Sequence, residues 1–138
     1  MKSWILCAIG AVGGAISAAF GGWNAGLTTL VIFMAIDYLT GIIVAGVFHK
    51  SKKTENGRLE SNAGWKGLCK KGAILLVVLV AVRLDLMIGT DFIRDAVVIG
   101  FICNDGLSIM ENVGLMGLEY PEPIKKAFDV LSKKIDKQ

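Results

Sequence analysis

The sequence has little of the side-chain chemistry on which catalysis and metal binding depend. Its single histidine is His49, and its three cysteines, Cys7, Cys69 and Cys103, lie far apart without a CxxC pair. An odd number of isolated cysteines argues against a disulfide framework and against a zinc site. No HExxH motif, nucleophile–histidine–carboxylate set or phosphate-binding loop is apparent. We therefore expect no enzyme activity and no catalytic, cofactor-binding or metal site.

Charge is absent from long parts of the chain, of which 54% is hydrophobic and only 20% charged. The apolar residues collect in four runs, 4–20, 27–48, 72–89 and 96–118. A helix needs about 20 residues to cross a bilayer, and runs of this length are too continuous for strands. Helices also satisfy their own backbone hydrogen bonds, as lipid requires. We predict an all-α integral membrane protein whose transmembrane domain, 1–118, has four spans.

The first and third runs are the weaker predictions, so three spans are also possible. The third run contains Arg83 and Asp85, and the first run is short. Lys2, the apolar stretch after it and an alanine pair could also form a cleaved signal peptide. A single lysine is little for such a signal, and the regular glycines of this run are more typical of a packed helix.

The basic residues predict the orientation of the chain, since short cytoplasmic loops of membrane proteins are rich in lysine and arginine. The loop 49–71 has seven of the 15, Lys2 precedes the first run, and five lie beyond residue 118. With four spans, all of these are cytoplasmic if both termini are inside, and only Arg83 and Arg94 fall elsewhere. Beside a membrane, such a loop sets topology and contacts anionic lipid, so we expect no nucleic-acid partner.

The tail 119–138 predicts an amphipathic cytoplasmic helix. Apolar residues recur at helical spacing after two prolines, with lysines and acidic residues on the other face; they are Ile124, Ala127, Phe128, Leu131 and Ile135. A proline is tolerated in the first turn of a helix. Such a helix can lie on anionic lipid or pack on a neighbour. A solvated tail that is only marginally helical is an equal alternative.

Small residues predict where helices approach one another closely. Gly10, Gly14, Ala18 and Gly22 recur every four residues in the first run. Helices in lipid associate through close packing, for which such faces are suited. The contact can lie within one subunit or between subunits of a homo-oligomer. Gly41, one turn after Asp37, offers a similar approach on the second run.

Polar residues inside the apolar runs are the candidates for a functional role. A charged side chain at the bilayer centre is costly, so it faces protein or water and has a partner. Arg83 and Asp85 are two positions apart and point to nearly opposite sides of a helix, so we do not expect them to pair. The candidates for intramembrane polar contacts or gating are Asp37, Arg83, Asp85, Asn104, Asp105, Ser108, Glu111 and Asn112. For the stripe on the fourth run, interhelical hydrogen bonding alone is the alternative.

Four segments together resemble a known family. They are Ile-Asp-Tyr-Leu-Thr-Gly at 36–41, the basic segment 61–71 with Ser-Asn-Ala-Gly-Trp-Lys, the stretch 104–112 with Ser-x-x-Glu-Asn, and a Pro-Glu-Pro elbow within 117–123. In this order they are similar to the toxin-secretion and phage-lysis holins of Gram-positive bacteria and their phages, from about residue 27 to the C-terminus. Two features depart from the family pattern: Asp105 stands where glutamate is more common, and the elbow is longer.

The resemblance implies a holin of the bacterial cytoplasmic membrane. Such proteins oligomerise in the lipid bilayer and form lesions that release an endolysin or a toxin. A small ion channel or transporter is the alternative, and a membrane scaffold subunit without pore activity is a third. Release of folded protein from liposomes favours a holin, ion-selective currents without protein release favour a channel, and neither favours a scaffold.

Overall fold

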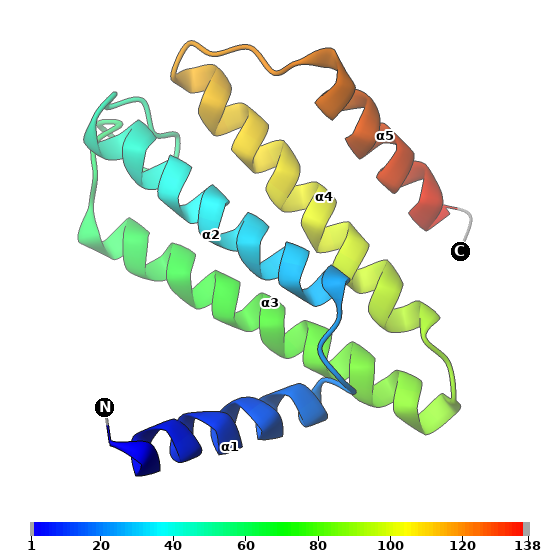
Figure 1. Ribbon diagram of the computed structural model, residues 1–138. Helices are drawn as coiled ribbons and strands as arrows, with labels where there is room; N and C mark the ends of the chain where they lie inside the picture. Colours follow the sequence, from blue (N-terminus) through cyan, green and yellow to red (C-terminus); the bar gives the residue numbers. More distant parts are fainter. Residues whose placement is uncertain (1, 137–138) are drawn as a thin grey trace.

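All regular secondary structure is helical in the part that the computed structural model describes, residues 2–136, with side chains as far as Lys134. The helices are α1 (Ser3–Ala19), α2 (Ala25–Gly46), α3 (Ser61–Ile88), α4 (Phe92–Leu115) and α5 (Glu122–Asp136). Figure 1 shows α2, α3 and α4 side by side, α5 folded back along α4, and α1 apart from the bundle. The predicted all-α class is confirmed. Ile135, which we expected on the apolar face of the tail, lies outside the described side chains.

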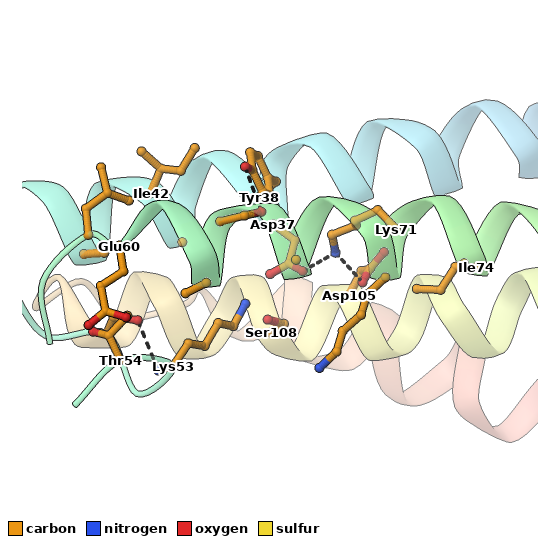
Figure 2. Close-up of a pocket in the computed structure, with 18 of the residues that line it drawn as sticks. Asp37, Tyr38, Ile42, Lys53, Thr54, Glu60, Lys71, Ile74, Asp105 and Ser108 are labelled. Atoms are coloured by element: carbon orange, nitrogen blue, oxygen red, sulfur yellow. Dashed lines mark hydrogen bonds and ion pairs between the residues drawn. The ribbon is translucent and has the colours of Figure 1, made fainter.

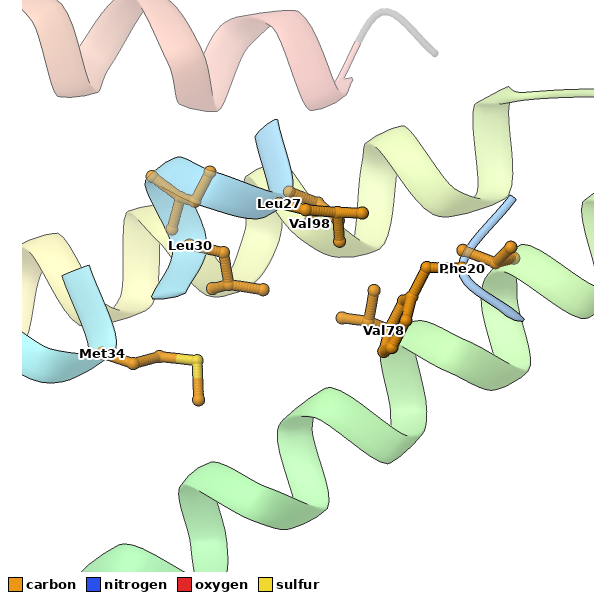
Figure 3. Close-up of a cluster of buried hydrophobic side chains, with 8 residues drawn as sticks. Phe20, Leu27, Leu30, Met34, Val78 and Val98 are labelled. Atoms are coloured by element: carbon orange, nitrogen blue, oxygen red, sulfur yellow. The ribbon is translucent and has the colours of Figure 1, made fainter. Parts of the chain in front are cut away.

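The apolar core lies between α2, α3 and α4, near the end of the bundle where α1 joins. Leu27, Leu30 and Val78 are fully buried there, and Figure 3 shows Phe20 and Met34 in the same cluster. Asn24 starts α2 as its N-cap, because its side chain accepts a hydrogen bond from the backbone N–H of Leu27 at 2.9 Å. The apolar core therefore holds one end of the bundle together, and polar contacts hold the other half.

Helix α3 begins well before the apolar run that predicted it. It starts at Ser61, so the second half of the expected loop 49–71 is helical. The ring of Tyr38 on α2 lies against Gly64 and Gly67 in this first part of α3, and the Tyr38 hydroxyl donates to the Gly64 carbonyl at 3.1 Å. Lysines that we placed in a loop are consequently on a helix that packs against α2, and Lys71 is one of them.

The bundle has an inverted distribution of polarity. Asp37, Asp85, Asp105 and Asn112 are buried, whereas large apolar side chains are exposed along the outer faces, among them Ile32, Leu39, Leu76, Val80 and Leu84. An apolar exterior of this extent is unusual for a protein in water and normal for one in lipid. Judged by length and composition alone, α2 is the described helix that suits a membrane crossing; α1 is apolar but shorter.

Asp85 joins the end of α3 to the start of α4. Its carboxylate accepts hydrogen bonds from the backbone N–H of Arg94 at 2.7 Å and of Ile93 at 3.2 Å, and from the Thr90 hydroxyl at 2.7 Å. Asp91, at the position of the N-cap, makes no such bond. Asp85 thus satisfies N–H groups that the first turn of α4 leaves without partners. Gly89, with φ of 83°, makes the sharp turn between the helices possible.

Replacing Asp85 by alanine should lower the free energy of unfolding by about 1–2 kcal/mol, which is typical of a lost N-cap. The measurement is an SDS titration of helicity in detergent micelles. Asp91→Ala is the matched control, because Asp91 is exposed and caps nothing, and it should change stability by less than about 0.5 kcal/mol. Equal losses for the two variants would show that Asp85 is not the cap of α4.

Candidate functional site

A cluster of charged side chains lies at the centre of the bundle and joins three helices. Asp37 comes from α2, Lys71 from α3 and Asp105 from α4 (Figure 2). The Lys71 ammonium group donates to Asp37 Oδ2 and, at 3.1 Å, to Asp105 Oδ1. The side chains of Asp37 and Asp105 are 6% and 2% exposed, and that of Lys71 is 15% exposed. One cation therefore links two buried carboxylates from different helices.

Asn112 adds a second connection between α2 and α4. Its amide Nδ2 donates to the Thr40 hydroxyl at 2.9 Å and lies 3.3 Å from both the backbone carbonyl and the Oδ1 of Asp37. Thr40 can accept this bond because its own hydroxyl donates to the Ile36 carbonyl at 2.8 Å. Both oxygens of the Asp37 carboxylate consequently have donors, one from Lys71 and one from Asn112.

Asp105 is less well satisfied than Asp37. Its Oδ2 is buried and has no hydrogen-bond partner among the described residues. Buried polar atoms of this kind are rare, because desolvation without a partner is unfavourable. A cavity of about 230 Å³ adjoins the cluster, with Lys53 and Ser108 in its lining. The cluster holds two carboxylates and one ammonium group, and the oxygen left without a donor is Asp105 Oδ2. Water that enters this cavity would therefore stabilise Asp105 most.

The structure brings together some of the predicted polar residues and separates others. Asn104 and Ser108 line the cavity beside Asp105. Glu111 lies at the surface and pairs with Lys52 at 3.2 Å; both side chains are more than half exposed, so the pair adds little stability. Arg83 is exposed and, as expected, does not pair with Asp85, whose contacts are those of a helix cap.

Gly10, Gly14 and Ala18 of α1 do not pack against another helix in the described part of the subunit. A Cβ atom placed on Gly10 or Gly14 would have no neighbour within 4 Å outside its own helix, and Ala18 is exposed. Gly41 differs, since a Cβ there would lie 3.9 Å from Asn112 Nδ2, at ordinary contact distance. Space alone therefore does not require glycine at position 41.

Sequence reasoning missed Lys71, which is the centre of the cluster. The apolar run of α3 starts at Gly72, so Lys71 was counted with the solvent-facing cations before it. The signal that could have found it was the need of Asp37 for a partner. Lys71 directly precedes the apolar run 72–89, which must pack against the helix of Asp37.

Comparison with known proteins decides the family. The profile of the bacteriophage holin family matches residues 14–133. The chain belongs to the bacteriophage holin family. It is 30% identical over 113 residues to a probable holin of Bacillus phage phi105, which covers 81% of this chain and 78% of the phage protein. Family membership implies a non-enzymatic protein of the cytoplasmic membrane that forms oligomers.

Bacterial relatives of this holin-family chain are more similar still. An uncharacterized 14.9 kDa protein from the nagH 3′ region of Clostridium perfringens is 41% identical over 117 residues, 83% of each chain. An uncharacterized protein of Listeria monocytogenes is 37% identical over 106 residues, 76% of this chain and 70% of its own. No solved structure matches the chain.

Removing the cation of the cluster should destabilise the bundle strongly. Lys71→Met leaves two buried carboxylates without a counter-charge, and we expect a loss of about 3–5 kcal/mol in the free energy of unfolding in micelles. Asp37→Asn and Asp105→Asn added to this variant should recover most of that loss. Lys70→Met is the matched control, since Lys70 is exposed. If both lysine variants behave alike, Lys71 is not the central cation.

Proposed function

We propose that this holin-family chain oligomerises in the bacterial cytoplasmic membrane and forms lesions that release an endolysin or a toxin. The observation that carries the proposal is the inverted bundle, in which buried charged groups bond to one another inside and the outer faces are mainly apolar. The match to the holin family and the similarity to the probable holin of phage phi105 support the same activity.

The proposed topology has four membrane spans, made by α1 to α4. Helices α3 and α4 carry charges that would oppose insertion if each helix were alone. In the bundle, Lys71 and Asp105 neutralise each other's charge and Asp85 is bound by backbone N–H groups. Paired charges inside a bundle are the form in which membrane helices tolerate ionisable residues.

The proposed orientation has both termini in the cytoplasm. The α2–α3 loop and the first turns of α3 hold seven of the 15 basic residues, and the chain beyond α4 holds five more. The first turn of α4, on the opposite side, has Arg94 with Asp91 and Asp95 beside it. This asymmetry favours retention of the α2–α3 loop in the cytoplasm.

Cysteine labelling of intact cells tests this topology before lysis begins. In a chain without native cysteines, an impermeant thiol reagent should reach cysteines that replace Asn24 and Thr90, because both lie in outer turns. It should not reach cysteines that replace Ser61 and Ser132 until the membrane is permeabilised. Labelling at position 61 in intact cells would show that the orientation is the reverse of the proposed one.

The open face of α1 is proposed as a contact with a second copy of the chain. Gly10→Leu together with Gly14→Leu places two bulky side chains on that face, which has no contact within the subunit that they could disturb. Crosslinked oligomers should diminish and lysis should be delayed. Val12→Leu, on the opposite side of α1, should change neither. Unaltered crosslinking of the double variant would show that this face of α1 is not part of the interface between subunits.

The charge cluster is proposed as the gate. The cluster has two carboxylates and one ammonium group, that of Lys71, and hydration of the cavity beside Asp105 would favour an open state. A difference of a few kcal/mol in hydration between two states is enough to change their populations substantially. Asp37→Asn removes the excess charge and keeps the shape of the side chain, while Lys71 keeps its ion pair with Asp105.

Asp37→Asn should therefore insert and oligomerise normally but delay or abolish lysis, and Asp37→Leu should fail to open as well. The measurement is a lysis curve after induction, with membrane fractionation, and release of a folded protein from proteoliposomes. Asp91→Asn, an exposed carboxylate outside the cluster, is the control and should lyse on time. Normal timing by Asp37→Leu at wild-type membrane levels would exclude the carboxylate from the gate. Ion currents without protein release from wild-type proteoliposomes would refute the proposed lesion.

A further inference from the structure

A lesion that passes folded protein needs a wall of polar side chains facing water. The outer faces of α1, α2 and α3 offer mainly apolar ones, such as Ile9, Leu39 and Val80. Helix α4 contributes a short polar strip with Asn104 and Glu111, but this strip reaches only from the middle of α4 to its C-terminal end. Within the described chain, the four proposed spans thus lack a polar face of full bilayer depth.

Helix α5 has a longer polar face, since its 15 residues extend about 22 Å. Among its described side chains, the charged ones are all exposed; they are Glu122, Lys125, Lys126, Asp129, Lys133 and Lys134. Its more covered residues, Phe128 and Leu131, lie on the other side, toward the bundle. The helix is therefore strongly amphipathic, and on its apolar side Phe128 and Leu131 are partly covered while Ile124 stays exposed.

The contacts of α5 with the bundle have a specific shape. Phe128 lies directly over Gly106 of α4, where any Cβ atom would overlap its ring. The same ring meets Phe33 of α2 edge-on, with centroids 6.0 Å apart and an interplanar angle of 66°. One turn further on, the Ser132 hydroxyl lies 3.7 Å from Cys103 Sγ of α4. Phe128 thus occupies a notch that glycine leaves open at position 106.

Docked in this way, α5 runs beside α4 over much of the depth of the spans. It begins beyond the C-terminal end of α4 and runs back beside it, as Figure 1 shows. Lys134 lines a small cavity together with Asn24 and Arg94. Both residues lie at the N-terminal ends of their helices, α2 and α4, far from the end of α4 where α5 begins. Lipid cannot surround the charged face of α5 at this depth, because lysine and aspartate are strongly disfavoured in hydrocarbon. The docked arrangement requires water along α5.

We propose that α5 docks on α4 in the open lesion and that its lysine-bearing face forms the wall facing water and the released protein. Before opening, α5 lies at the cytoplasmic surface, undocked from Gly106. The inference rests on the proposed function and names the helix that lines the lesion.

A disulfide between α4 and α5 reports the docking. The variant Ser132→Cys, with Cys7→Ser and Cys69→Ser, keeps Cys103 as the other thiol. Cells are treated with a membrane-permeant oxidant before and after lysis is triggered, and the crosslinked monomer is resolved by its mobility on a gel. We expect the crosslink only after opening. Val130→Cys in the same background should not crosslink, because Val130 is exposed and points away from α4.

A second pair of variants tests whether docking is needed for release. Gly106→Leu fills the notch and should abolish both the crosslink and protein release, while membrane insertion and oligomerisation remain. Gly106→Ala with Phe128→Ala removes the ring that would clash with the new methyl group, and it should release more protein than Gly106→Ala alone.

Three outcomes would overturn the inference. Equal crosslinking before and after opening would place α5 beside α4 in the closed state. If the wild type releases protein but the crosslink never forms after opening, the proposed lesion stands and α5 is not part of its wall. Absence of protein release by the wild type would refute the proposed function, and the lining of a lesion with it.

Discussion

The ammonium group of Lys71 lies between carboxylates of two other helices, and the rest of the bundle depends on this arrangement. In a medium of low dielectric constant, Asp37 or Asp105 alone would be too costly to bury. Bonded to Lys71 and Asn112, they join α2, α3 and α4 in the half of the bundle that the apolar core does not reach. Because these charged groups bond to one another inside the bundle, the outer faces are free to be apolar.

The same arrangement is poised for change, because its charges do not balance. Asp37 has a donor for each oxygen, whereas Asp105 leaves Oδ2 unmatched beside a cavity. The bundle of α2, α3 and α4 is therefore suited to lipid but would respond to hydration. Helix α5 has the complementary property, since its docked position is compatible with water and incompatible with lipid. In our account, hydration of the cluster and docking of α5 are two parts of one transition.

Much of this architecture could be predicted from the sequence, and the misses share one physical cause. Long uncharged runs indicated the helices, and the expense of a buried carboxylate identified Asp37 and Asp105 as important. A sequence shows which groups need partners but not which partners they find. Lys71 was assigned to a loop because lysines usually mark solvent, and Asp85 was grouped with gating residues although it caps α4. The amphipathic pattern of α5 defined its apolar face, but the notch at Gly106 that receives Phe128 exists only in three dimensions.

The central claim is that Lys71 bonds to both carboxylates when the chain is in a bilayer. Solid-state NMR of the oligomer in lipid vesicles, with ¹⁵N in the lysine side chains and ¹³C in the aspartate carboxyl groups, measures this directly through nitrogen–carbon dipolar dephasing. The account predicts strong dephasing of one lysine signal, absent in Lys71→Met, weakened in both Asp37→Asn and Asp105→Asn, and unchanged in Asp91→Asn. A Lys71 signal without carboxyl dephasing in the wild type would contradict it.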